Sequence, residues 1–316
     1  MNNSMTPEEV AALLKIKKNT VYELIKRGDL NAYRVGRKYR IDMKDIEVYK
    51  QRQGKTQAAS DSSVLGKTMA TPIFRKLEHE VPGYLVICGQ DMLLDVLTRH
   101  LENSPYGYQA LRQQVGSMAG LNALYHEKVD IATAHLWDGD RDEYNTAYVR
   151  YLVPGMKKIM IHLVSRMQGF YVAAGNPLNI KGWDDLTRPD VRMVNREKGS
   201  GARVLLDEKI RILDIDRRQI KGYEQQKQSH LEIASIVARG EADVGLGSQK
   251  ASMQVRGIEF IPLQKERYDM VLLKERIHEP KIQAVIEVVR SQEFKDDIAA
   301  MGDYDVSEMG NEMEID

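Results

Sequence analysis

The chain has 316 residues, of which 42% are hydrophobic, and its 46 basic side chains balance 46 acidic ones. No window approaches 18 uninterrupted apolar residues and no apolar segment opens the chain, so the pattern predicts neither a membrane span nor a signal peptide. Cys88 is the single cysteine, which excludes an intrachain disulfide and a cysteine-rich metal site. We expect a soluble cytoplasmic protein with no bound metal or cofactor.

Residues 6–28 have the pattern of two short helices joined by a tight turn, the layout of a helix-turn-helix. Thr6 can cap the first helix, Pro7 suits its first turn, and Glu9 stands where a capping box needs it. Gly28 supplies a left-handed stop after the second helix. Apolar side chains at helical spacing give each helix one buried face, and they are Val10, Leu13 and Leu14, followed by Val21, Leu24 and Ile25.

Residues 33–41 alternate long polar and apolar side chains around Gly36, which is typical of a two-stranded hairpin. The side chains on its exposed side are arginine and lysine, as a wing lying along a phosphate backbone requires. Asp42 is expected to cap a third helix over residues 43–51, with Ile46 turned inward.

This region resembles the excisionase-type, MerR-like winged helix family. The shared motifs are TPEEVA at residues 6–11, TVYxLIxRGxL at residues 20–30 and VGRKYRI at residues 35–41. The resemblance implies that residues 18–26 enter the major groove of double-stranded DNA and that the wing follows the backbone or the minor groove. The candidate DNA contacts are Lys18, Asn19, Thr20, Tyr22, Lys26, Arg34, Arg37, Lys38 and Arg40.

Charge supports the same division of the chain. Residues 1–55 hold 13 lysines and arginines against 7 acidic residues, and the remaining residues hold 33 against 39. A basic head on an acidic body predicts that only the head is drawn to a polyanion. The alternative is a charge-rich small domain that packs against the body.

A linker is predicted between the head, residues 1–52, and the body, residues 81–316. Residues 52–63 are polar, small and without periodicity, as in a flexible linker. Residues 64–80 have some helical spacing interrupted by Pro72, and we interpret them as a connector or a dimer contact. The linker and connector together cover residues 53–80.

The body alternates strand-like apolar runs with amphipathic helices, which predicts an α/β fold with mainly parallel sheets, in two lobes. The predicted strands cover residues 84–88, 129–134, 158–164, 170–174, 191–195 and 242–247. The clearest helices cover residues 91–101 and 231–239. Small polar residues follow the strands at 89–91, 116–120, 198–203 and 229–230. Such junctions bind ligands in open α/β sheets, although helix capping alone explains each of them.

The order of motifs in the body resembles the periplasmic-binding-protein-like domain related to molybdate-binding proteins, which occurs fused to helix-turn-helix heads. The motifs lie at residues 145–150, 169–177, 185–186, 188–192, 195–196, 199–203 and 242–247. The resemblance implies a type II binding-protein fold that crosses between lobes near residues 165–171 and returns near 257–269. Lobe one would be about 81–166 with 268–316, and lobe two about 170–262.

The same resemblance places a ligand between the lobes. The candidate ligand-binding residues are Gln90, Asp91, Ser117, Met118, His135, Arg196, Gly199, Ser200, Gly201, Arg203, Ser229 and His230. His135 is as readily a structural histidine, and Arg196 and Arg203 as readily form salt bridges. Asp91 departs from the family pattern, because a carboxylate repels a dianion in a cleft of low dielectric constant. Either it turns away to cap its helix, which we favour, or the ligand is larger and carries hydrogen-bond donors.

We therefore predict a dimeric one-component transcription regulator that senses a small oxyanion, molybdate or tungstate. The alternatives are a sensor of an organic metabolite or a molybdenum-cofactor-like ligand, and an excisionase-like architectural protein that binds no ligand. The sequence has no nucleophile elbow, Walker loop or HExxH motif, so it predicts no enzyme and no catalytic residue. Cys88 lies within an apolar run, where a thiol is usually inert.

Overall fold

The computed structural model describes residues 4–14, 16–27, 30–35, 38–43, 45–46 and 84–316, and the chain divides into two compact units between Ile73 and Phe74. The units are described separately. The predicted linker over residues 53–80, the turn glycines Gly28 and Gly36, and Arg37 lie outside the described residues, as do most positions of the predicted third helix. Within the described part, no helix is long and apolar enough to cross a membrane.

The head is a helix-turn-helix followed by a hairpin. Its elements are β1 (Ser4–Met5), α1 (Pro7–Leu14), α2 (Lys18–Arg27), β2 (Tyr33–Val35) and β3 (Lys38–Asp42). The predicted capping box is confirmed, because Thr6 N donates to Glu9 Oε2 at 2.7 Å and Glu9 N donates to Thr6 Oγ1 at 3.3 Å. The hairpin is confirmed by antiparallel pairing of β2 with β3. An unpredicted strand, β1, pairs with the other edge of β3.

The head's core agrees with the predicted faces except at one residue. The fully or nearly fully buried side chains are Val10, Val21, Leu24, Leu30, Ile41 and Ile46. Leu13 is 39% exposed, so its assignment to the buried face was wrong. Helix α1 instead buries Pro7, Val10 and Ala11, because a helix this short turns only one narrow stripe toward its partner. Asp42 belongs to β3, where its Oδ1 accepts a hydrogen bond from the Tyr33 hydroxyl at 3.2 Å.

One mixed sheet runs through the body, with strand order β11-β10-β12-β9-β13-β6-β4-β5 and with β14 paired to β9. The strands are β4 (Tyr84–Cys88), β5 (Gln109–Gln113), β6 (Ile131–Ala134), β9 (Lys158–Ala173), β10 (Met193–Arg196), β11 (Gln226–Lys227), β12 (Val244–Ser248), β13 (Ile258–Leu273) and β14 (Glu312–Ile315). Pairs of β4 with β5 and β6, and of β10 with β11 and β12, are parallel. Pairs that involve β9 or β13 are antiparallel.

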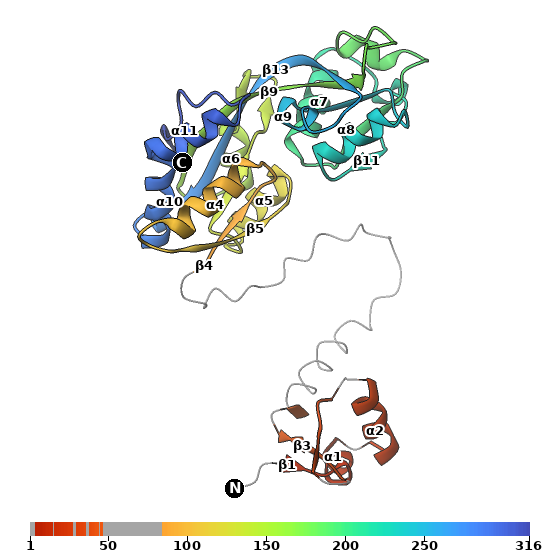
Figure 1. Cartoon of the computed structure of the whole chain (residues 1–316), viewed down its shortest axis with the longest axis vertical. Helices are drawn as coiled ribbons and strands as arrows, with labels where there is room; N and C mark the ends of the chain where they lie inside the picture. The colour runs from red at the N-terminus through yellow and green to blue at the C-terminus, as the bar shows by residue number, and fades with distance from the viewer. Residues whose placement is uncertain (1–3, 15, 28–29, 36–37, 44, 47–83) are drawn as a thin grey trace. The chain divides into compact units, whose positions relative to one another are not determined.

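Strands β9 and β13 run side by side through both lobes (Figure 1). The prediction of two separate strands at 158–164 and 170–174 was wrong, because β9 continues through the polar residues between them. The pairing shifts register between Pro262 and Gln264 and again between Tyr268 and Asp269. These irregularities lie within the predicted crossing region.

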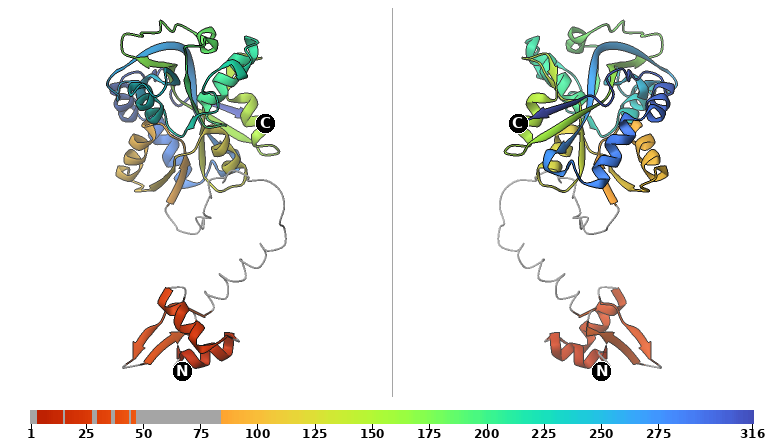
Figure 2. Two further views of the ribbon diagram at one scale, coloured as in Figure 1. Left: turned by 90° about the vertical axis from the view of Figure 1, so that its right-hand side faces the viewer. Right: turned by 90° about the vertical axis from the view of Figure 1, so that its left-hand side faces the viewer.

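Helices cover both faces of the body's sheet (Figure 2). They are α4 (Leu93–Asn103), α5 (Ser117–Tyr125), α6 (Thr146–Leu152), α7 (Gly201–Ile212), α8 (His230–Ala238), α9 (Gln249–Ser252), α10 (Pro280–Arg290) and α11 (Gln292–Ala300). In the first lobe, α4, α10 and α11 share one core, whereas α5 and α6 share another. In the second lobe, α7 and α8 belong to two further cores. The two lobes are joined by β9 and β13, and Val204 of α7 also packs into the first-lobe core of α5 and α6.

Candidate ligand site between the lobes

The loops after β4 and β5 in the first lobe meet the loops after β10 and β11 in the second. Met118 N donates to Gly199 O at 3.0 Å, so a carbonyl of one lobe occupies an N-terminal amide of α5 in the other. Arg196 Nη2 donates to Gln90 Oε1 at 2.5 Å, and Gln90 Nε2 donates to the Gln228 carbonyl at 3.2 Å. These contacts hold the lobes together where parallel strands end, the usual place for a ligand in α/β sheets.

A buried arginine on β9 lies beside this contact. Arg166 forms an ion pair with Asp91, and its Nε donates to Glu266 Oε1 at 2.5 Å. Its guanidinium also lies 4.4 Å from the centre of the Tyr268 ring. Glu266 on β13 accepts a further hydrogen bond from Gln168 Nε2 at 2.8 Å, and its other oxygen lies 2.8 Å from His135 Nδ1. We call Asp91, His135, Arg166, Gln168 and Glu266 the interlobe cluster.

Asp91 contacts both the start of α4 and a buried cation on β9. Its Oδ1 accepts from Leu93 N at 2.7 Å, which stabilises the start of α4, and from the Tyr304 hydroxyl at 2.7 Å. Its Oδ2 pairs with Arg166 inside the body. The carboxylate therefore caps its helix without turning away, since a buried cation compensates its charge.

Glu266 remains charged at neutral pH because of its partners. Burial raises the pKa of Glu266, but Arg166 and His135 lower it by more than burial raises it. The resulting pKa is about 2, against an ordinary value of 4.5. A carboxylate with a lowered pKa in the folded protein stabilises the fold at pH values above its ordinary pKa. That contribution is lost as the pH falls from about 4.5 toward 2.

We expect Glu266→Gln to flatten the acid limb of the stability profile of the full chain. In the wild type, protonation of Glu266 removes its charge-assisted bonds to Arg166 and His135 as the pH falls through this range. Urea unfolding between pH 7 and pH 2.5 measures the effect. A variant that loses stability on acidification as steeply as the wild type contradicts the assignment.

His230 begins α8 and places its ring against β12. A methyl group on Gly247 would lie 2.6 Å from His230 Nδ1 and 2.2 Å from the Tyr171 hydroxyl. Burial lowers the pKa of His230 well below 6.5, and Arg196 and Arg166 lower it further, so the ring is neutral at pH 7. Its Nδ1 is buried and has no hydrogen-bond partner among the described residues.

The other predicted ligand residues contact His135, cap helices or form a salt bridge within the second lobe. Ser117 Oγ accepts from His135 N at 3.3 Å, and Gly201 lies so close to the His135 ring that a side chain there would overlap it. Ser200 and Ser229 cap α7 and α8, accepting from Arg203 N and Glu232 N. Arg203 is drawn away from the other lobe: it pairs with Asp207 at 2.9 Å and lies over the Tyr223 ring.

Sequence reasoning missed Arg166, Gln168 and Glu266. Each is a buried polar side chain near the middle of a long strand. The available signal was the position of these polar runs between apolar strand segments, although buried charges are rare unless paired. Cys88 is buried, and burial raises the pKa of its thiol to about 12, consistent with the expectation of low reactivity.

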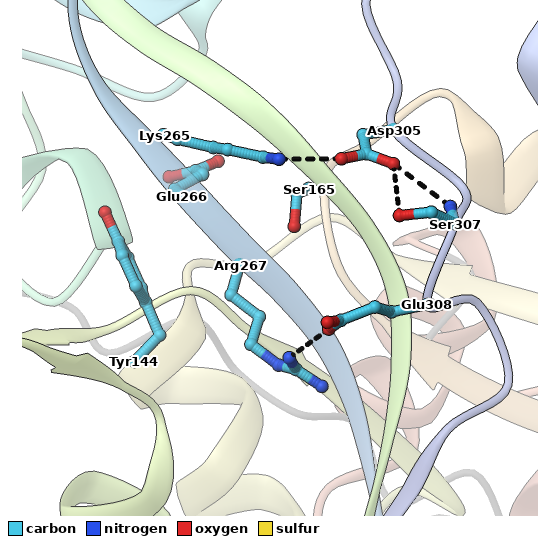
Figure 3. Close-up of a pocket in the computed structure, with 8 residues that line it drawn as sticks. All are labelled: Tyr144, Ser165, Lys265, Glu266, Arg267, Asp305, Ser307 and Glu308. Atoms are coloured by element: carbon cyan, nitrogen blue, oxygen red, sulfur yellow. Dashed lines mark hydrogen bonds and ion pairs between the residues drawn. The ribbon is translucent and has the colours of Figure 1, made fainter.

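A cavity of about 320 Å³ lies beside the crossing strands, and Glu266 is among the residues that line it. Lys265 Nζ lies 2.6 Å from Asp305 Oδ2, and Arg267 Nη1 lies 2.8 Å from Glu308 Oε2 (Figure 3). Glu266 lies between these two basic residues in the sequence and belongs to the interlobe cluster. Both pairs tie β13 to the segment before β14.

In the head, the predicted recognition helix exposes the expected side chains. Lys18, Asn19, Thr20 and Tyr22 are exposed on α2, and Arg40 on β3 is half-buried. Lys18 pairs with Glu8 and lies 5.9 Å from the centre of the Tyr22 ring. The side chains of Lys26, Arg34, Arg37 and Lys38 lie outside the described residues.

Comparison with known families agrees with this two-part architecture. Residues 4–54 match a helix-turn-helix domain, and residues 98–290 match the PBP superfamily domain. The chain belongs to the PBP superfamily. The chain is 40% identical over 308 residues to the uncharacterised protein YvgK of Bacillus subtilis (strain 168), which covers 98% of this chain and 97% of YvgK.

Solved structures share the fold of the PBP-like body. A protein of Clostridium perfringens, described as a phosphate ABC transporter substrate-binding protein with bound phosphate, aligns with a TM-score of 0.53 and 15% identity, covering 70% of this chain and 98% of that one. The sulfate-binding protein SubI of Mycobacterium tuberculosis H37Rv aligns with a TM-score of 0.53 and 13% identity, covering 70% and 86%. The predicted combination of a helix-turn-helix head with a two-lobed PBP-like body is thus confirmed.

Proposed function

We propose that the protein is a ligand-responsive transcription regulator. The observation that carries this proposal is the joining of a helix-turn-helix domain to a PBP-like body whose two lobes bring buried polar groups together. The head binds double-stranded DNA and the body binds a small ligand between the lobes. Such a function requires a cytoplasmic location. A single small head offers few base contacts, so we propose that the regulator acts as a homodimer.

The proposed DNA contacts are the exposed face of α2 in the major groove and the basic wing along the backbone or minor groove. Lys18, Asn19 and Tyr22 supply donors, acceptors and an aromatic ring on that face. Ligand and DNA binding must influence each other equally in free energy. The direction of that coupling is a matter for measurement.

Charge reversal of the wing by Arg37→Glu and Lys38→Glu is expected to weaken DNA binding and to flatten its salt dependence. Each lost phosphate contact lowers the slope of log K against log salt by about 0.9. Fluorescence anisotropy at several salt concentrations measures that slope. The matched control is Arg217→Glu with Arg218→Glu, an adjacent exposed basic pair on the body. An unchanged slope in the wing variant would remove the wing from the proposed interface.

For the ligand we propose a small oxyanion, with molybdate and tungstate as the first candidates. The support is the order of motifs in the body and the placement of helix starts near the lobe contact: Ser117 begins α5, Ser200 caps α7 and His230 begins α8. Helix N-termini offer unpaired amides and a partial positive charge to an anion.

A second ligand class is favoured by the acidic side chains of the interlobe cluster. Asp91 and Glu266 are two buried carboxylates beside one guanidinium. An organic metabolite or a molybdenum-cofactor-like molecule could offer these groups hydrogen-bond donors, whereas a fully ionised oxyanion accepts only. In the excisionase-like alternative the body binds no ligand. That alternative predicts that no added ligand changes the affinity of the protein for DNA.

Thermal unfolding with molybdate, tungstate, sulfate and phosphate tests the oxyanion proposal. Binding to the folded state adds about 2.7 kcal/mol of stability at a hundredfold excess over the Kd. We expect the double variant Ser117→Ala with Ser200→Ala to lose this stabilisation while still folding. Ser291→Ala, which removes the cap of α11 in the first lobe, is the control for the loss of a cap. Full stabilisation in the double variant would put the site elsewhere.

A further inference from the structure

Three buried polar atoms near the lobe contact have no partner among the described residues: Gln168 Oε1, His230 Nδ1 and Arg112 Nε. Gln168 is 0% exposed. A buried polar atom without a partner is destabilising, so native proteins seldom retain one without a ligand, an ion or a water to satisfy it. These atoms indicate what the site requires from its ligand.

The orientation of the Gln168 amide follows from its neighbour. Its Nε2 lies 2.8 Å from Glu266 Oε1, and an ionised carboxylate only accepts hydrogen bonds. The amide nitrogen must therefore face Glu266, and the unpartnered atom is the carbonyl oxygen. A carbonyl oxygen can be satisfied only by a donor.

Two arginines at the lobe contact are paired with protein acceptors. Arg166 is bound to Asp91 and Glu266, and Arg196 is bound to Glu197, Gln90 and the Gln228 carbonyl. No described residue donates a hydrogen bond to Gln168 Oε1, which leaves a bound molecule or a water as the donor. Helix starts near the lobe contact favour a negative charge on the same molecule.

We propose that the ligand is a small anion that also donates a hydrogen bond, and that Gln168 is the residue that requires the donor. This inference rests on the proposed function of the interlobe site and decides between its two ligand classes. Molybdate, tungstate and sulfate are fully ionised at neutral pH and have no donor. Hydrogen phosphate retains a proton, and a hydroxy acid has its hydroxyl group.

The test uses the full chain and two matched pairs of anions that differ mainly in the donor. The inorganic pair is hydrogen phosphate, which has a donor, and sulfate, which has none. The organic pair is lactate, which has a donor, and pyruvate, which has none. Calorimetry measures each affinity at pH 7. We expect the donor-bearing member of at least one pair to bind at least about a hundredfold more tightly, because a buried acceptor left unpaired discriminates strongly.

Gln168→Met removes the acceptor with little change in volume, and we expect it to abolish that preference within the pair. Gln264→Met is the control, because Gln264 lies opposite Gln168 on β13 and donates instead to the Tyr144 hydroxyl at 2.9 Å. If Gln168→Met does not fold, the wild-type comparison of the two pairs still decides the outcome.

Three results overturn the proposal: equal affinity within both pairs, tighter binding of molybdate, tungstate or sulfate, or no binding of either donor-bearing anion. Binding of molybdate that alters DNA affinity would overturn only the donor requirement and leave the proposed regulator intact. The proposed function itself fails if the full chain does not bind duplex DNA at low salt.

Discussion

Replacing Arg166 by methionine is expected to destabilise the body by about 3–5 kcal/mol, the range found when one partner of a buried ion pair is removed. The variant leaves Asp91 and Glu266 buried without their shared cation. It also removes the guanidinium from the face of the Tyr268 ring. Urea unfolding of the full chain, followed by circular dichroism, measures the loss.

Arg188→Met is the matched control, since Arg188 also pairs with two carboxylates, those of Asp185 and Asp190, but its side chain is 34% exposed. Exposed pairs contribute about 0–1 kcal/mol. Adding Glu266→Gln to Arg166→Met should recover part of the lost stability, because one uncompensated charge is removed. Equal effects at Arg166 and Arg188 would show that the buried cation does not hold the cluster together.

Removal of residues 1–63 is expected to abolish DNA binding and to leave ligand binding unchanged. The body has its own cores in both lobes, and it forms a compact unit from Phe74 onward. Its sequence beyond residue 55 is acidic, with 33 basic against 39 acidic side chains, so it should not attract a polyanion. Electrophoretic mobility shifts with duplex DNA at low salt measure the first effect, and calorimetry with the anion panel measures the second.

The full chain serves as the reference in both measurements, and the wing variant with Arg37→Glu and Lys38→Glu is the intermediate case. Retained DNA affinity in the shortened chain would refute the assignment of DNA binding to the head. Loss of ligand binding would mean that the head contributes to the ligand site.

The helices and the hairpin in the described part of the head could be predicted because their signals are local. The capping box of Thr6 and Glu9 and the hairpin around Gly36 each depend on residues close together in the sequence. Leu13 was misplaced because helical spacing alone does not tell which side of an apolar stripe the partner covers. The positions of the loops between the lobes were also predictable, since they follow from where parallel strands end.

The chemistry between the lobes could not be predicted from the same patterns. Arg166 and Glu266 are 100 residues apart and become neighbours only through the pairing of β9 with β13. The polar stretch that contains Arg166 looked like an interruption between strands, although it is the middle of one. The sequence showed that a carboxylate at Asp91 is unusual for an anion site. The cation that compensates its charge, Arg166, is 75 residues away in the sequence and could not be identified from it.

The register irregularities in β13 divide that strand on either side of residues 264–268. A bulge bends a strand and increases its twist, and between the two irregularities residues 264–268 stay paired with residues 164–168 of β9. Successive side chains point to opposite faces of a strand, so Glu266 faces inward while Lys265 and Arg267 face Asp305 and Glu308 outside. Glu266 and the two outer ion pairs thus belong to one short paired segment, and we expect a fluorophore near Asp305 to report ligand binding at the interlobe cluster.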